Sequence, residues 1–275
     1  MDYQLHQNAT LQATVTTVLG SLSLITGLIF IYFLGFLYTY SADLKAVLTV
    51  KNLLLFGLQL FQIGYFASHA CYISFQISRP ISVIEAVFLA GWESCFIWVS
   101  WTRSHDVFHV SSSPQAIKVF QVLVIITTVV TLIPPITILI DFNPEEGELA
   151  YIGSVLANGI SIFILDTYFV FCYLMYLFQR TVETVELKGY EVDAVSIFRI
   201  IARYGLFASI ATFACLCFVG GVASVSTDPN GDIYQYAIFI MLTDISCFLS
   251  TLCLVLMKMK LVRFRVCQKN KNIKK

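Results

Sequence analysis

Three acidic side chains, Glu93, Asp166 and Asp244, stand inside long apolar stretches of the sequence. Carboxyl groups inside a membrane are costly, so they normally face the interior of a helix bundle, with partners or water. At 1.5 Å per residue each lies about 15 to 20 Å from the outer end of its predicted helix, and we expect no Lys or Arg at that level. In a shared cavity these acids could bind a cation, a cationic ligand or a proton, hold a water network, or hydrogen-bond across helices as protonated carboxyls.

A second group of candidate residues, His69, Glu85 and Trp92, is predicted nearer the outer ends of its helices. Glu85 and Trp92 are seven residues apart, so they fall on one face of a helix. A carboxylate beside His69 would stabilise its imidazolium form, so His69 and Glu85 could make a pH-sensitive pair; a histidine with an ordinary hydrogen bond is the alternative. Together with the three deeper acids, these residues are the candidate lining of a ligand or ion cavity.

Sequence signatures of catalysis and of metal binding are missing. The chain contains no HExxH motif, no GxSxG motif and no glycine-rich phosphate loop. Cys215 and Cys217 form a CxC pattern, but residues two apart on a helix point in different directions and no His accompanies them, so we interpret both as small buried hydrophobic side chains. We expect no enzyme activity, no cofactor, no bound metal and no nucleic-acid partner.

Seven apolar runs must position these residues. Hydrophobic residues make up 58% of the 275 positions and charged residues 12%, against about 25% charged residues in a soluble domain. Each run reaches the ~20 residues that a helix needs to cross a ~30 Å hydrocarbon core. We therefore predict an all-α membrane protein, a seven-transmembrane helix bundle at 15–257, between an amino-terminal tail at 1–14 and a basic tail at 258–275. Pro134 and Pro135 should kink the fourth helix. The runs cover 15–40, 50–77, 81–102, 119–140, 152–178, 200–224 and 233–257.

Positive charge is distributed unequally between the two sides of the predicted bundle. Sixteen of the seventeen Lys and Arg residues fall on one set of alternating connections, and Arg79 is alone on the other. Because cytoplasmic loops retain Lys and Arg, the amino terminus is predicted to be outside and the carboxyl terminus inside. The sequon Asn8-Ala9-Thr10 then lies in the extracellular tail, which predicts glycosylation at Asn8.

On the predicted cytoplasmic side, three Arg residues are candidates for contact with a signalling partner. Arg103 follows the third run, while Arg199 and Arg203, four residues apart, would form one basic edge of a sixth helix that extends beyond the membrane. Residues 258–267 are predicted to form an amphipathic helix that lies on the inner leaflet of the lipid bilayer and ends at a candidate palmitoylation site, Cys267.

The seven spans, the outer amino terminus and the basic inner tail resemble the architecture of the G-protein-coupled receptors over nearly the whole chain. An Arg closes the third span in Trp101-Thr102-Arg103, without the acid that usually precedes it, and the seventh span has Asp244-Ile245-Ser246 where an Asn-Pro motif is usual. The resemblance implies a receptor, in the plasma membrane, that senses an unknown small ligand and engages a cytoplasmic partner such as a heterotrimeric G protein.

Other functions share this topology. Microbial-type rhodopsins do, but no Lys lies within 233–257 to hold retinal. A cation or proton transporter or channel that uses the intramembrane carboxylates is the main alternative, although an odd number of spans and the lack of an evident inverted repeat are unusual for transporters. A structural or assembly role is the third possibility.

Overall fold

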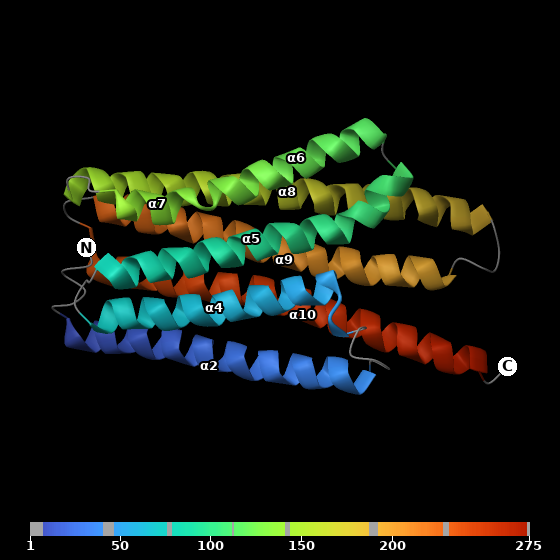
Figure 1. Cartoon of the computed structure of the whole chain (residues 1–275), viewed down its shortest axis with the longest axis horizontal. Coiled ribbons are helices and arrows are strands. Elements are labelled where there is room, and N and C mark those ends of the chain that lie inside the picture. The colour runs from blue at the N-terminus through green and yellow to red at the C-terminus, as the bar shows by residue number, and fades with distance from the viewer. Residues whose placement is uncertain are drawn as a thin grey trace.

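The computed structural model describes residues 8–40, 47–75, 79–111, 113–140, 144–186, 192–227 and 231–273, and helix is the only regular secondary structure within these ranges. The helices lie along one long axis, with the two ends of the chain at opposite ends of the bundle (Figure 1). We call these ends the N-terminal and the C-terminal end of the bundle. Residues 1–7 of the predicted amino-terminal tail lie outside the described ranges. In chain order the helices are α2 (Ala9–Tyr40), α4 (Val50–Ser74), α5 (Arg79–Ser111), α6 (Pro114–Val130), α7 (Ile133–Leu139), α8 (Pro144–Glu186), α9 (Val192–Thr227) and α10 (Ile233–Ile273).

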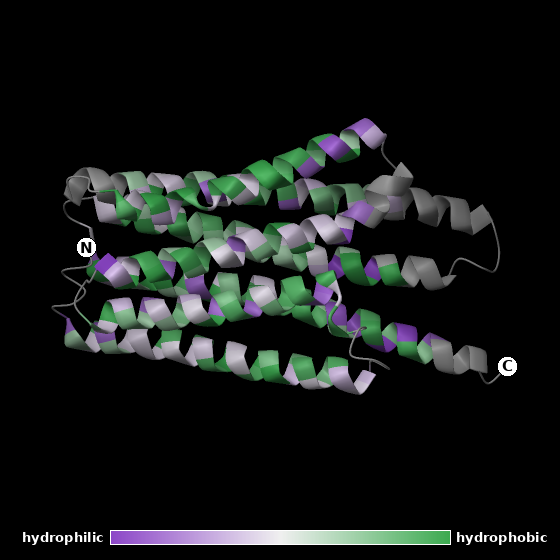
Figure 2. Cartoon of the chain, viewed as in Figure 1, coloured by the Kyte–Doolittle hydropathy of each residue, from purple (hydrophilic) through white to green (hydrophobic). Residues whose placement is uncertain are grey.

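Seven segments of the described chain are long and apolar enough to cross a membrane, with α6 and α7 together forming one of them. Apolar residues cover most of each ribbon, whereas hydrophilic residues gather in the C-terminal part of α10 (Figure 2). Large apolar side chains such as Leu24, Ile31 and Val122 point out of the bundle and are more than half exposed, as contact with lipid requires. The predicted fold, an integral multi-pass bundle of seven transmembrane helices, is confirmed.

The fourth span is interrupted at Thr131 and Leu132, where α6 ends and α7 begins. Pro134 and Pro135 follow at once, and each lacks the N–H that would complete the helical ladder and clashes with a carbonyl of the preceding turn. The Thr131 hydroxyl lies 2.8 Å from the hydroxyl of Ser94 on α5, so the break is joined to the neighbouring helix. The predicted kink is confirmed.

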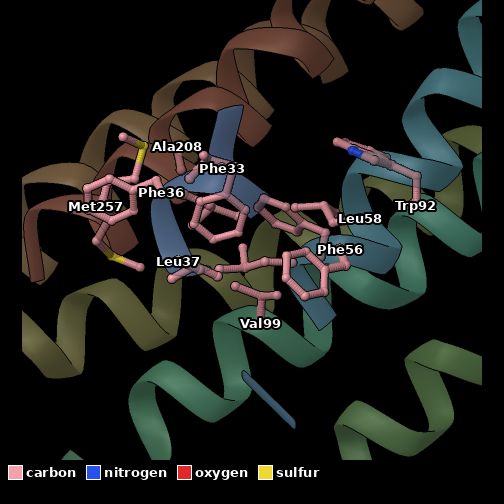
Figure 3. Packing of buried hydrophobic residues seen from close by; sticks show 14 of the residues in the cluster. Phe33, Phe36, Leu37, Phe56, Leu58, Trp92, Val99, Ala208 and Met257 are labelled. Atoms are coloured by element: carbon pink, nitrogen blue, oxygen red, sulfur yellow. The ribbon is translucent and has the colours of Figure 1, made fainter. Parts of the chain in front are cut away.

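A large buried cluster joins α2 to the rest of the bundle (Figure 3). Phe33 of α2 is fully buried, and its ring meets the ring of Phe56 on α4 edge to face, with centroids 5.7 Å apart. Val99 of α5 and Met257 of α10 belong to the same cluster. Lipid tails are as apolar as these side chains, so close packing, rather than exclusion of water, is what holds the helices together here.

Helices α4 and α5 approach each other closely through two glycines. A Cβ on Gly64 of α4 would lie 2.4 Å from the Phe88 ring of α5, and a Cβ on Gly91 of α5 would lie 2.5 Å from the Phe61 ring of α4. The two rings are themselves in contact, with centroids 6.4 Å apart. Each helix therefore offers a notch to the aromatic ring of the other, which fixes their relative register.

Helix α10 continues without a break from the last span to Ile273. We expected 258–267 to form a separate helix along the membrane surface, and this expectation is wrong. No Gly or Pro follows Met257 to end the helix. Leu261 and Val262 instead pack against the cluster that contains Phe36 of α2, and the Arg263 guanidinium lies 5.3 Å from the Phe36 ring centroid.

Helix α2 begins at Ala9, six residues before the predicted start of the first span, because Asn8 caps it. The side-chain oxygen of Asn8 accepts a hydrogen bond from the Leu11 N–H at 3.2 Å, as a typical N-cap residue does. The sequon therefore sits at the very start of the first helix. Glycosylation at Asn8, and the orientation of the chain in the membrane, stay predictions.

Replacing Gly91 by Ala is expected to lower the unfolding temperature, because the added methyl group would press on the Phe61 ring. Overpacking of this kind costs about 1 to 3 kcal/mol. Gly20→Ala is the matched control, since a Cβ there has no neighbour within 4 Å. Thermal unfolding of both variants in lipid nanodiscs tests this, and equal unfolding temperatures would contradict the close approach of α4 and α5.

Replacing Asn8 by Asp separates glycosylation from helix capping. Asp caps a helix about as well as Asn but cannot carry an N-linked glycan. In a glycosylating host we expect the wild-type protein, but not Asn8→Asp, to lose mass on glycosidase treatment, with equal thermal stability of the unglycosylated forms. An epitope tag beside Lys275 should be reached by antibody only after the cells are permeabilised; labelling of intact cells would reverse the predicted orientation.

Candidate functional site

The ionisable candidate residues lie in three groups along the bundle interior. The first group, near the N-terminal end, brings together His69 of α4, Glu85 of α5 and Asp244 of α10. The Nδ1 atom of His69 lies 3.4 Å from Oδ2 of Asp244 and 4.0 Å from Oε1 of Glu85. Asp244 is fully buried and His69 is 9% exposed. The sequence suggested His69 and Glu85 as a pair but did not place Asp244 with them.

The second group occupies the middle of the bundle. The Asn158 amide of α8 donates a hydrogen bond to the carboxyl of Glu93 on α5. The neighbouring Trp92 donates its indole N–H to the hydroxyl of Thr251 on α10, at 2.9 Å. Trp92 therefore serves as a link between helices, on the same stretch of α5 as the carboxyl of Glu93.

Two thiols extend this middle group. Cys215 of α9 and Cys247 of α10 place their sulfur atoms 3.3 Å apart as free thiols. Cys247 is within electrostatic reach of both Asp244 and Glu93, so it lies between the first and second groups. Cys217, by contrast, is exposed and Cys215 is only partly buried, so the expectation that both are buried hydrophobic side chains is wrong. Within the described ranges, no three His, Cys, Asp or Glu side chains are arranged to hold a metal ion.

The third group, nearer the C-terminal end, is an ion pair between Arg103 of α5 and Asp166 of α8. The Arg103 Nη2 atom lies 3.0 Å from Oδ1 of Asp166, and the two residues are 7% and 0% exposed. Ser100 donates its hydroxyl to the same carboxylate oxygen at 2.6 Å, and Ser209 of α9 donates to the other oxygen. Asp166 is therefore satisfied by three donors from two helices besides its own.

The arginine is fixed from its other sides as well. Tyr173 of α8 donates its hydroxyl to the backbone carbonyl of Arg103, at 3.0 Å. A Cβ on Gly205 of α9 would lie 2.8 Å from Nη1 of Arg103, so only glycine lets the guanidinium lie in this position. The ion pair thus joins α5, α8 and α9 at a single point.

Two expectations about this region are wrong. We expected no basic side chain at the level of the acids, yet Arg103 reaches back from the end of its predicted span to Asp166. We also expected Arg103 on the cytoplasmic surface as a partner contact, and it is buried. Arg199 and Arg203 are exposed on α9, which extends toward the C-terminal end as predicted, and Arg203 lies 6.0 Å from the Phe207 ring centroid. Cys267 is exposed on α10.

The three acids are buried in the bundle, but each has a different partner: Asp244 has His69, Glu93 has Asn158 and Asp166 has Arg103. A surface depression that the structure shows lies elsewhere, on α2, lined by Ala9 to Val18. That the acids serve one common ligand or ion cavity stays a prediction. The partners were not found from the sequence because helical spacing identifies residues that share a face, such as Ser100 with Arg103, but not which helix that face meets.

Neutralising one member of the ion pair is expected to destabilise the protein more than neutralising both. Arg103→Gln leaves a buried carboxylate without its counter-charge, and Asp166→Asn leaves a buried guanidinium; each should cost about 3 to 5 kcal/mol. The double variant Arg103→Gln/Asp166→Asn should recover most of that loss. Unfolding temperatures of the three variants in nanodiscs measure the coupling, and additive losses would contradict a direct pair.

A scan against models of protein families finds none that matches this chain, and a search of curated proteins finds no similar sequence.

Proposed function

We propose that the protein is a seven-helix receptor that senses a small ligand from the N-terminal end of the bundle and signals to a cytoplasmic partner at the C-terminal end. The observation that carries this proposal is the buried Arg103–Asp166 pair. It joins three helices near the end where the sequence predicts the cytoplasm, and it lies at a distance from the His69 group at the other end. A receptor needs such a connection, whose opening alters the arrangement of helices on the far side of the membrane.

The surroundings of the pair favour two discrete states. With Ser100 and Ser209 the carboxylate is fully satisfied, so a partly opened pair would leave charged groups unpaired in a medium of low dielectric. The closed arrangement is therefore held strongly, and an open one needs new partners, such as water from the cytoplasm or a docked protein. A ligand that binds the two arrangements with different affinity shifts the balance between them.

The partner is proposed to dock at the C-terminal end of the bundle. Arg199 and Arg203 are exposed there on α9, and α10 carries exposed Lys260, Arg263 and Arg265. A basic surface steers an acidic partner into contact. A heterotrimeric G protein is the partner that the resemblance to the G-protein-coupled receptors suggests, with the plasma membrane as the location.

A cation or proton transporter is the alternative, favoured by two carboxyls, Glu93 and Asp244, that no Arg of the described part of the chain neutralises. The Arg103 guanidinium speaks against a cation path through the whole bundle, because a cation that passed the second group would then meet a fixed positive charge. We therefore rank the receptor first.

Gly205→Ala tests the receptor proposal, because the added methyl group displaces the Arg103 guanidinium without removing any charge. We expect it to raise ligand-independent nucleotide exchange on at least one member of a panel of purified heterotrimeric G proteins, measured with the receptor in nanodiscs. A loss of about 1.4 kcal/mol from the closed state would change the ratio of the two states tenfold. Gly220→Ala on the same helix is the control, since its Cβ would have no neighbour within 4 Å.

Flux measurements test the transporter in the same preparations. Proteoliposomes that contain the wild-type protein should show no proton or sodium flux above protein-free liposomes. Flux that is present in the wild type and lost in Glu93→Gln would reject the receptor proposal in favour of the transporter. An unchanged exchange rate in Gly205→Ala across the panel, together with such a flux, would leave the ion pair a structural contact.

A further inference from the structure

We propose that His69, Glu85 and Asp244 form a proton-binding site, and that its protonated form ties α4 to α5 and α10. The ligand of the bundle is then the proton itself, taken up from the solution at the N-terminal end. This inference rests on the proposed receptor function only for its signalling consequence; the binding site stands on its own geometry.

The geometry around His69 carries the proposal. A single ring nitrogen, Nδ1, is the atom nearest to both carboxyls, at 3.4 Å from Asp244 and 4.0 Å from Glu85. In a neutral imidazole that nitrogen carries either a lone pair, which repels a carboxylate, or one hydrogen, which can donate a good hydrogen bond to one carboxylate oxygen. An imidazolium is attracted by both carboxylates at once, because its charge acts on each of them whatever the exact alignment.

Burial increases the difference in free energy between the site with a neutral His69 and the site with a protonated His69. With a neutral His69, two carboxylates would stand side by side in a site where Asp244 is fully buried and Glu85 is 14% exposed in its side chain. Within the described residues, neither oxygen of Asp244 accepts a hydrogen bond, so the nearby imidazole is its main source of stabilisation. One added proton halves the net negative charge of the site, which the surroundings favour.

Tyrosine and apolar side chains surround His69 besides the two acids. Tyr65, one turn away on α4, lies beside the imidazole with ring centroids 5.6 Å apart and the rings tilted, and it is within electrostatic reach of Glu85, Asp244, Cys247 of α10 and Tyr151 of α8. Helix α2 packs against this part of α4 with apolar side chains, Val15, Leu19 and Leu22 among them. Among the described contacts, the two carboxyls are the groups that an imidazolium at His69 would stabilise.

Glu85 lies near the N-terminal end of the bundle, and protonation has a consequence for the helices. Glu85 lies less than two turns from the start of α5 and is partly exposed, so it can pass protons between solution and His69. Each of the three residues belongs to a different helix. Protonation therefore draws three helices together, and deprotonation leaves two like charges that push α5 and α10 apart.

The test measures thermal unfolding in nanodiscs between pH 8 and pH 6. In the proposed site the charge of a protonated His69 is held between two carboxylates that the unfolded chain separates, so protonation stabilises the folded protein and stability rises as the pH falls. We expect the wild-type unfolding temperature to rise by about 2 to 4 °C over this range. His69→Gln should abolish the rise, and Asp244→Asn should reduce it more than Glu85→Gln, in line with the two distances.

His105→Gln is the matched control, because His105 is the other histidine whose side chain the structure describes, and it lies beside Trp101 away from the site. It should keep the full rise. A rise that persists in His69→Gln, whether or not Asp244→Asn removes it, would overturn the proposal by placing the proton on a carboxyl or elsewhere. If His69→Gln does not fold, His69→Ala and His69→Asn take its place under the same criterion.

A second measurement separates this inference from the receptor proposal. Cells that express the wild-type protein are shifted from pH 7.5 to pH 6.0 outside, and G-protein activation is recorded beside His69→Gln and His105→Gln. A response that requires His69 supports both proposals. Proton-dependent stability without any cellular response keeps the binding site and rejects the receptor function. A response without His69-dependent stability rejects the site and leaves the receptor in place.

Discussion

A buried ion pair constrains how three helices of this bundle pack against one another. Arg103 and Asp166 are almost without contact to solvent, and further hydrogen bonds are needed to offset the cost of burying such a pair. The two serines supply such bonds to the carboxylate and Tyr173 supplies one to the Arg103 carbonyl. Gly205 leaves room for the guanidinium, whose Nη1 atom has no hydrogen-bond partner among the described residues. The packing of α5, α8 and α9 against one another follows from where these groups must stand.

Helix α5 takes part in each of the three polar groups. It contributes Glu85 to the first, Trp92 and Glu93 to the second, and Ser100 and Arg103 to the third. Trp92 follows Glu85 by seven residues, Ser100 follows Glu93 by seven, and Arg103 follows Ser100 by three, so these residues follow one side of the helix. Helix α5 thus combines an apolar side toward the exterior with a polar side toward the interior of the bundle. A rotation of α5 would disturb all three groups together.

The spans, the break at Pro134 and Pro135 and the extension of α9 could be predicted from the sequence. Each of them depends on local composition or on the covalent geometry of proline. The contact between Asp166 and Arg103 could not be predicted from local sequence patterns. A long flexible side chain can reach several ångströms back along its helix, so the depth of its Cα does not give the depth of its charge. The cap at Asn8 had a local signal, an Asn before an apolar run, whereas the meeting of His69 with Asp244 depended on which faces of α4 and α10 were opposed.

Because α10 is unbroken, its carboxyl-terminal segment moves as one stiff body with the membrane-spanning part of the helix. A helix is stiff along its axis, and Asp244 and Ile273 stand on the same helix of 41 residues, about 43 Å apart at 1.5 Å per residue. A tilt of about 5° around the level of Asp244 would displace the far tip by about 4 Å, somewhat less than the ~5.4 Å rise of one helical turn. A flexible tail would not transmit such a movement beyond its first flexible residues. A continuous helix instead converts a small change in interhelical distance into a larger displacement of its end, which a protein in the adjoining compartment could detect.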